Sequence, residues 1–272
     1  MSDPSVVHAQ LAVEGCTAEL YLNGIPVSRV GPRPRVPIEN AAVEELLVPG
    51  TNHLTVVAEP GSRPSQARTE YRDLDFRSLE ATGRLMRFRD GVPATKEHGE
   101  LLGEVSVSWQ DGNPARRSFP AEESTSIELG SAHGRWAWQD APPLTLDDAL
   151  VDEACRVMDE VAMAIHTKHG GQLWQLTELQ LQDVQRAYPA ITEQFLRGDL
   201  ADSLEEYEGI DDPVMPRDRS RHDFRLVGGD RLLELLDDDW TTSFKLRHPS
   251  DGSRVPYRIM LCRIEGVLRI VR

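Results

Sequence analysis

The sequence predicts two domains of different fold class, an antiparallel β-sandwich followed by an α+β domain whose helices pack on a curved antiparallel sheet. Three observations predict this arrangement. The chain has 272 residues, which exceeds the size of one average domain. Its first half alternates apolar and polar residues between frequent turns, whereas its second half opens with apolar residues at helical spacing. The pattern changes at Pro142-Pro143, so the predicted domains are residues 1–141 and 144–272.

Alternation with a period of two residues predicts the strands of the first domain. Apolar residues alternate from Val7 to Val13, and Leu20 and Leu22 share one face of a second strand. Asn23-Gly24 predicts a tight hairpin turn because both residues tolerate positive φ. Several short strands separated by Gly and Pro favour a β-sandwich. Further strands are expected over residues 51–57, 85–88, 101–109 and 135–138, and a surface loop with a short helix at 71–79 is expected over 60–83.

One part of this domain is similar to a known family. Ala18-Glu-Leu-Tyr-Leu-Asn-Gly24, followed by Leu46-Leu-Val-Pro-Gly-Thr-Asn-His-Leu-Thr-Val56, resembles the galactose-binding-like jelly-roll sandwich of many carbohydrate-active proteins. The resemblance implies a sandwich fold, with glycan binding as one function. Asn-Gly and Pro-Gly-x-Asn are also turn sequences in their own right, so a structural role is the alternative.

Helical periodicity opens the second domain. Thr145-Leu-Asp-Asp148 is similar to a capping box and predicts the start of a helix that Gly170-Gly171 ends. A second helix is expected from Leu173 to just before Pro189, and a third from about residue 190 to Leu204. Strands are expected over residues 224–227, 232–236, 242–246, 255–264 and 267–271, with a helix as the alternative over 232–236 and a tight hairpin at Glu265-Gly266.

Helices followed by an antiparallel sheet that closes with a long hairpin resemble the NTF2-like, cystatin-like α+β cone. The closest match is the ending Tyr257-Arg-Ile-Met-Leu-Cys-Arg-Ile-Glu-Gly-Val-Leu-Arg-Ile-Val-Arg272. In enzymes of this superfamily, the resemblance implies a general acid–base pair at the mouth of the cone. Asp223, Tyr257 and His222 are the weak candidates for that role. The alternative is a cone filled by apolar side chains, namely Leu226, Phe244, Ile259 and Leu261.

The charge of the chain excludes some partners and favours others. The formal net charge is −15, so phosphate backbones and anionic lipids are repelled, while a basic protein partner is attracted. One cluster of acidic residues consists of Glu205, Glu206, Glu208, Asp211 and Asp212. This acidic cluster is either a solvated loop or part of a surface that binds a partner. Neither a secretory signal nor a run of apolar residues long enough to cross a membrane is present, which favours a cytoplasmic location. Only three lysines among 30 basic residues suggest a bacterial gene.

Few residues suggest specific chemistry. Trp136 and Trp138 are expected on one side of a strand, as a sugar-stacking platform or as buried packing. His166 and His169 are spaced for one helix face, but helix capping is favoured over a metal site. The three cysteines form no CxxC pair, and no phosphate-binding loop or nucleophile elbow is present. No metal or cofactor is therefore predicted.

The preferred function from sequence is non-catalytic: a binding or accessory protein, such as an immunity or adaptor protein, that docks a protein partner. The first alternative is an NTF2-like enzyme or small-molecule binder with a polar pair in the cone. The second is glycan binding by the sandwich. The oligomeric state is left open.

Overall fold

The computed structural model of the chain describes residues 5–31, 38–59, 78–89, 91, 93–95, 98–110, 120–130, 134–206, 222–237, 245–247 and 254–272. Over these residues the protein is of mixed α+β class, with three four-stranded antiparallel sheets, one two-stranded sheet and a few helices. No described helix is long and apolar enough to span a membrane. The chain divides into two compact units, residues 1–134 and 135–272. This division falls earlier in the chain than the Pro142-Pro143 pair.

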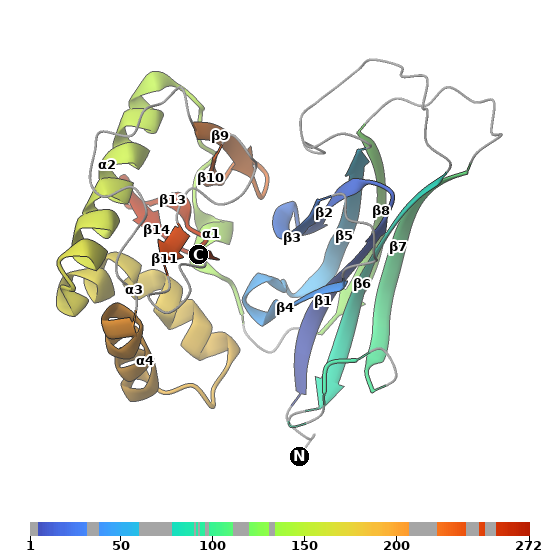
Figure 1. Ribbon diagram of the computed structural model, residues 1–272, viewed down its shortest axis with the longest axis horizontal. Coiled ribbons are helices and arrows are strands. Elements are labelled where there is room, and N and C mark those ends of the chain that lie inside the picture. Colours follow the sequence, from blue (N-terminus) through green and yellow to red (C-terminus); the bar gives the residue numbers. More distant parts are fainter. Residues whose placement is uncertain are drawn as a thin grey trace. The chain divides into compact units, whose positions relative to one another are not determined.

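Two four-stranded antiparallel sheets make up the described part of the first unit (Figure 1). The first sheet has the strand order β4-β1-β6-β7 and the second sheet has the order β3-β2-β5-β8. A short 3-10 helix, Glu44–Leu46, precedes β5. The strands are β1 (Ser5–Glu14), β2 (Thr17–Leu22), β3 (Ile25–Val30), β4 (Ile38–Ala42), β5 (Gly50–Glu59), β6 (Ser78–Arg89), β7 (Glu100–Gln110) and β8 (Ala121–Leu129).

The two sheets touch through their apolar faces. Leu11 on β1 and Leu20 on β2 are completely buried, as the alternating pattern predicts. Gly83 on β6 lies so close to the other sheet that a Cβ atom there would collide with the side chains of Leu20 and Val56. Gly83 therefore permits a close approach between β6 and the second sheet.

Several local predictions for the first unit are confirmed and others are wrong. Asn23 and Gly24 both have positive φ, 54° and 75°, as the hairpin turn between β2 and β3 requires. Strand β8 was missed because only Ala121, Ile127 and Leu129 point inward among otherwise polar residues. The predicted loop over 60–83 is wrong from residue 78 onward, where β6 begins; residues 60–77 lie outside the described part of the chain.

The second unit places helices before its strands in the chain (Figure 1). Its four-stranded sheet has the order β14-β13-β10-β9, and β11 pairs with β12. The elements are α1 (Ala137–Asp140), α2 (Asp148–His166), α3 (Gly170–Ala187), α4 (Glu193–Glu206), β9 (His222–Val227), β10 (Leu232–Asp237), β11 (Lys245–Arg247), β12 (Arg254–Pro256), β13 (Met260–Ile264) and β14 (Val267–Ile270).

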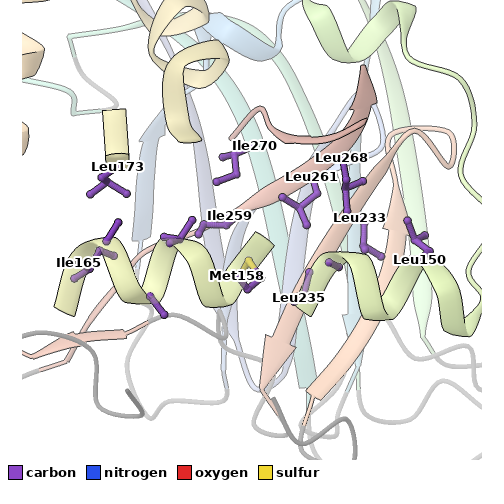
Figure 2. Close-up of a cluster of buried hydrophobic side chains, with 14 of the residues drawn as sticks. Leu150, Met158, Ile165, Leu173, Leu233, Leu235, Ile259, Leu261, Leu268 and Ile270 are labelled. Carbon is purple, nitrogen blue, oxygen red and sulfur yellow. The ribbon is translucent and has the colours of Figure 1, made fainter. Parts of the chain in front are cut away.

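One apolar cluster joins the helices to the sheet. Figure 2 shows Leu150, Met158 and Ile165 along α2 with their side chains among those of the strands. The sheet contributes Leu233, Leu235, Leu261, Leu268 and Ile270, the segment before β13 contributes Ile259, α3 contributes Leu173 and α4 contributes Leu204. Their burial is the main stabilising contribution to this unit, because each fully buried Leu or Ile side chain contributes roughly 1.5–3 kcal/mol.

Three sequence predictions for this unit need correction. Residues 135–138 do not form a strand, because Trp136 precedes the short helix α1. The predicted strand over 255–264 is two strands, β12 and β13, separated by residues 257–259. Gly170-Gly171 begins α3 rather than ending α2; the turn between the helices uses Lys168, whose φ is 53°.

Candidate functional site

The predicted acid–base pair does not assemble. Asp223 on β9 is in register with Leu236 on β10, and opposed residues of an antiparallel pair point to the same face. Leu235 belongs to the cluster against the helices, so Leu236 and Asp223 point to the other face of the sheet. Tyr257 packs against the helix-side cluster. The sheet therefore separates Asp223 from Tyr257, and the side chain of His222 lies outside the described part of the structure.

The environment of Tyr257 is largely apolar. Burial raises the pKa of this phenol to about 12. Among the apolar side chains named from sequence, Ile259 and Leu261 belong to the cluster on the helix-facing side of the sheet (Figure 2), and Leu226 packs against that cluster. Phe244, the fourth of that set, lies outside the described residues.

A buried charged cluster occupies the opposite face of the C-terminal sheet. The carboxylate of Glu234 is 1% exposed. Arg225 donates to it from Nε at 2.7 Å and contacts it through Nη2 at 2.6 Å, and Nε of Arg258 lies 3.4 Å from the other oxygen. Because the carboxylate is enclosed by two guanidinium groups, its chemistry is structural: it holds β9, β10 and the segment before β13 together.

A second buried carboxylate, also paired with arginine, lies in the first unit. Glu19 on β2 is completely buried, and it accepts hydrogen bonds from Nε of Arg29 at 2.6 Å and from the hydroxyl of Tyr21 at 2.8 Å. The pairing of Glu19 with Arg29 follows the β2–β3 register. This cluster stabilises the hairpin of β2 and β3, and its carboxylate is buried.

A third acid links a helix to the closing hairpin. Glu153 on α2 accepts from Nη2 of Arg263 at 2.7 Å, from Nη1 at 3.3 Å and from the backbone N–H of Leu268 at 3.2 Å. The hydrogen bond from Arg263 is the main cause of a lowered pKa for the Glu153 carboxyl group. Glu153 thereby ties α2 to β13 and β14.

We expect Glu153→Gln to lower the free energy of unfolding by about 1 kcal/mol at neutral pH, because a partly exposed charged pair and one backbone bond are weakened. Since the folded-state pKa is lowered, this stabilisation is present above the ordinary value of 4.5 and is lost as the pH falls through the lowered pKa. Urea unfolding of both proteins should therefore show a difference that disappears in acid. Glu160→Gln, an exposed change on the same helix, is the control; an equal loss in both variants would contradict the prediction.

Neither tryptophan forms an exposed platform. Trp136 is completely buried beneath the guanidinium group of Arg186, whose Cζ lies 4.8 Å from the ring centroid, and Trp138 is 7% exposed. The side-chain oxygen of Gln139 accepts from the backbone N–H of Trp136 at 2.8 Å and fixes the start of α1. Neither ring is therefore exposed for stacking against a sugar, and Trp136 packs against Arg186 of the same unit.

The two histidines act at helix ends. Nδ1 of His169 accepts from the backbone N–H of Gln172 at 3.1 Å and so caps the N-terminus of α3, whereas the sequence placed it at the C-terminus of α2. His166 lies in the last turn of α2. Across the described residues, no group of three or more His, Cys, Asp or Glu side chains is arranged to hold a metal ion.

The motif that resembles galactose-binding-like domains forms a turn network. Asn52 is completely buried and its Oδ1 accepts from the backbone N–H of Val48 at 2.8 Å and from Nδ2 of Asn23 at 2.9 Å. Its Nδ2 donates to the carbonyl groups of Val48 and Gly50 at 2.9 and 3.1 Å. Asn52, the buried asparagine of the motif, is thus engaged in hydrogen bonds of the turn.

The acidic cluster continues onto a helix face that the sequence did not identify. Glu205 and Glu206 are exposed in the last turn of α4, and Nζ of Lys168 lies 3.6 Å from the Glu205 carboxylate. The other members of the predicted cluster, Glu208, Asp211 and Asp212, lie outside the described residues. Helix α4 itself carries five acids and one base, so the acidic surface extends along its length.

Phe195 marks the exposed face of α4. It is 59% exposed, the largest value among the large apolar side chains described. It borders a surface depression of about 420 Å³. Phe195, Asp199 and Asp202 follow a spacing of four and three residues, so they share one helix face. The described lining residues are Thr192, Gln194, Phe195, Gly198, Asp199 and Asp202.

The sequence contained a signal for this face. Leu196, Leu200 and Leu204 recur every four residues and form the side of α4 that packs inward, with Leu204 in the main cluster. Phe195 is one position away from that row and cannot share its side. Hydrophobicity alone would assign Phe195 to the core. The four-residue spacing of the leucines indicates instead that Phe195 lies off the buried side of α4.

Comparison of the whole chain with protein-family models, with curated proteins and with solved structures found no match. Fold and site together define an α+β protein with structural charged clusters and an exposed acidic face on α4.

Proposed function

We propose that this is a non-catalytic cytoplasmic binding or accessory protein that docks a basic segment of a protein partner on the exposed face of α4. The observation that carries the proposal is the exposure of Phe195. This large apolar side chain lines a surface depression together with Asp199 and Asp202. Aromatic side chains are enriched at the centre of protein interfaces and polar groups at their rims, and Phe195 with Asp199 and Asp202 beside it has that arrangement. An adaptor or immunity role would use such a face, and the gene would be bacterial.

The charge of the helix favours a basic occupant. Arg197, the one base of α4, is directed at neighbouring side chains: its Cζ lies 3.8 Å from the ring centroid of Trp174 and its Nε donates to Glu193 at 2.7 Å. The face around Phe195 therefore presents only carboxylates among its described charged groups. With a chain charge of −15, a basic partner is also attracted over a distance.

We also propose a fold type for each of the two units. We take the first unit as a β-sandwich domain, supported by the close approach of Gly83 on β6 to Leu20 and Val56 of the second sheet. We take the second unit as an NTF2-like domain, supported by helices that precede an antiparallel sheet and share its apolar cluster. The enzymatic alternative is weaker, because Asp223 and Tyr257 lie on opposite faces of the sheet.

A fluorescent lysine-rich peptide tests the function. We expect the protein to bind it in an anisotropy titration with an affinity that falls as salt rises, and the double variant Asp199→Asn/Asp202→Asn to bind about threefold more weakly. The control is Glu160→Gln/Glu178→Gln, which removes the same charge from exposed positions on α2 and α3. Equal weakening in both doubles, or no binding of the peptide at all, would refute docking on α4. A duplex DNA probe should stay unbound.

A further inference from the structure

We infer that the segment docked on α4 is an amphipathic basic helix whose apolar side chain lies beside Phe195, above Gly198. This inference rests on the proposed function and deepens it, because it names the conformation of the partner and the position of its anchor. It starts from Gly198, a glycine in the interior of α4.

The structure gives no internal reason for this glycine. A glycine in a helix interior is destabilising relative to alanine, and a close neighbour that leaves no room for a side chain would be a structural reason for one. A Cβ atom added to Gly198 would have no described atom within 4 Å, apart from its chain neighbours and the nearby backbone of its own helix. Its missing side chain instead leaves a notch on the outward face of α4, between Phe195 and Asp202.

The geometry of the face fits a helix better than a strand. A helix surface has no free backbone N–H or C=O groups to pair with a strand, whereas its rows of side chains three and four residues apart accept the rows of a second helix. Phe195, Asp199 and Asp202 form such a row, and Gly198 is the gap beside it. At about 1.5 Å per residue, the 14 residues of α4 offer a track of about 20 Å.

A second copy of this chain fits the face poorly. A symmetric pair would place Asp199 and Asp202 of one copy against the same residues of the other, so like charges would be opposed at the centre of the interface. A partner helix with Lys or Arg at two positions and a Leu or Phe between them would neutralise these carboxylates. Its apolar side chain would cover Phe195, which is otherwise in water.

The probe for this inference is an amphipathic helical peptide of leucine and lysine, compared with a scrambled peptide of the same composition. We expect the wild-type protein to bind the amphipathic peptide about tenfold more tightly. Gly198→Leu fills the notch and should remove this preference. Ala201→Leu adds the same apolar bulk at an exposed position of α4 outside the lining of the depression, and it should leave the preference unchanged.

Two further measurements separate the possible failures. Gly198→Ala should unfold at the same or a higher temperature than the wild type, which shows that the position tolerates a side chain. If Gly198→Leu keeps the preference, or if both peptides bind equally while Asp199→Asn/Asp202→Asn still weakens binding, the helix inference is wrong and charge-driven docking stands. If neither peptide binds, the proposed function itself fails. A dimer in sedimentation that Gly198→Leu dissociates would assign the face to a second copy and overturn the inference.

Discussion

Replacing Glu234 by alanine is expected to lower the free energy of unfolding of the second unit by about 3 kcal/mol. The carboxylate is 1% exposed, and its removal leaves Arg225 and Arg258, 15% and 24% exposed, without the anion that neutralises them. Urea unfolding followed by tryptophan fluorescence measures the loss, because Trp136, Trp138 and Trp174 lie in this unit. A loss below about 1 kcal/mol would show that the guanidinium groups are solvated well enough without their partner.

Two further variants identify the cause of that loss. Glu234→Gln keeps the shape of the side chain and one acceptor oxygen, so it should be less damaging than alanine. The double change Glu234→Leu/Arg225→Met replaces the main ion pair with apolar groups, and it should recover much of the stability that Glu234→Ala loses. If the double variant is as unstable as Glu234→Ala, the stranded charge of Arg225 is not the main cost, which then lies in lost packing or in Arg258, still without its partner.

The second large effect is expected at the turn of the first unit. Asn52→Ala should lower the free energy of unfolding by about 2–3 kcal/mol, because the side chain of Asn52 is completely buried and its loss leaves the N–H and carbonyl of Val48 without their partner. Asn40→Ala is the matched control: its side chain is exposed, and its bonds to His8 and Ala94 can be replaced by water. Thermal unfolding of the two variants should differ clearly. Equal melting temperatures would contradict a structural role for Asn52 in the turn.

Asn52→Asp tests the same network with a different chemistry. It retains an acceptor for the backbone N–H of Val48, but it places a carboxylate oxygen against the carbonyl oxygens of Val48 and Gly50, where an N–H group now donates. We therefore expect it to be nearly as unstable as Asn52→Ala at neutral pH and to recover partly in acid, when the carboxyl group is protonated.

The site shows where sequence reasoning stops. Position along a strand placed Asp223 and Tyr257 near strand ends, but the face on which Asp223 lies depends on the pairing register of β9 with β10. Simple alternation places Tyr257 on the same side as Ile259 and Leu261, as the structure does, but it cannot say that Asp223 lies on the opposite face. The strand predicted over residues 135–138 was wrong for a related reason, because the sequence Trp-x-Trp is compatible with both a strand and a short helix.

Local chemistry along the chain was sufficient for much of the fold. The alternation of β1, the turn at Asn23-Gly24, the apolar period of α2 and the hairpin at Glu265-Gly266 are encoded within a few residues. Each depends on backbone preferences and on the periodicity of its own segment, which act before distant residues meet. The sequence by itself also determined the net charge of −15, from which we predict that nucleic acid is not bound by charge neutralisation.

The tertiary structure alone decided which polar groups are buried and which apolar group is exposed. Glu234 is enclosed because Arg225 is opposite it on the neighbouring strand and Arg258 reaches it from the segment before β13, and neither relation is visible along the chain. Phe195 is exposed because the Leu196 row of α4 faces inward, which leaves Phe195 beside the Gly198 notch. Burial is set by contacts between segments distant in sequence, so these two properties emerge only once the elements have packed together.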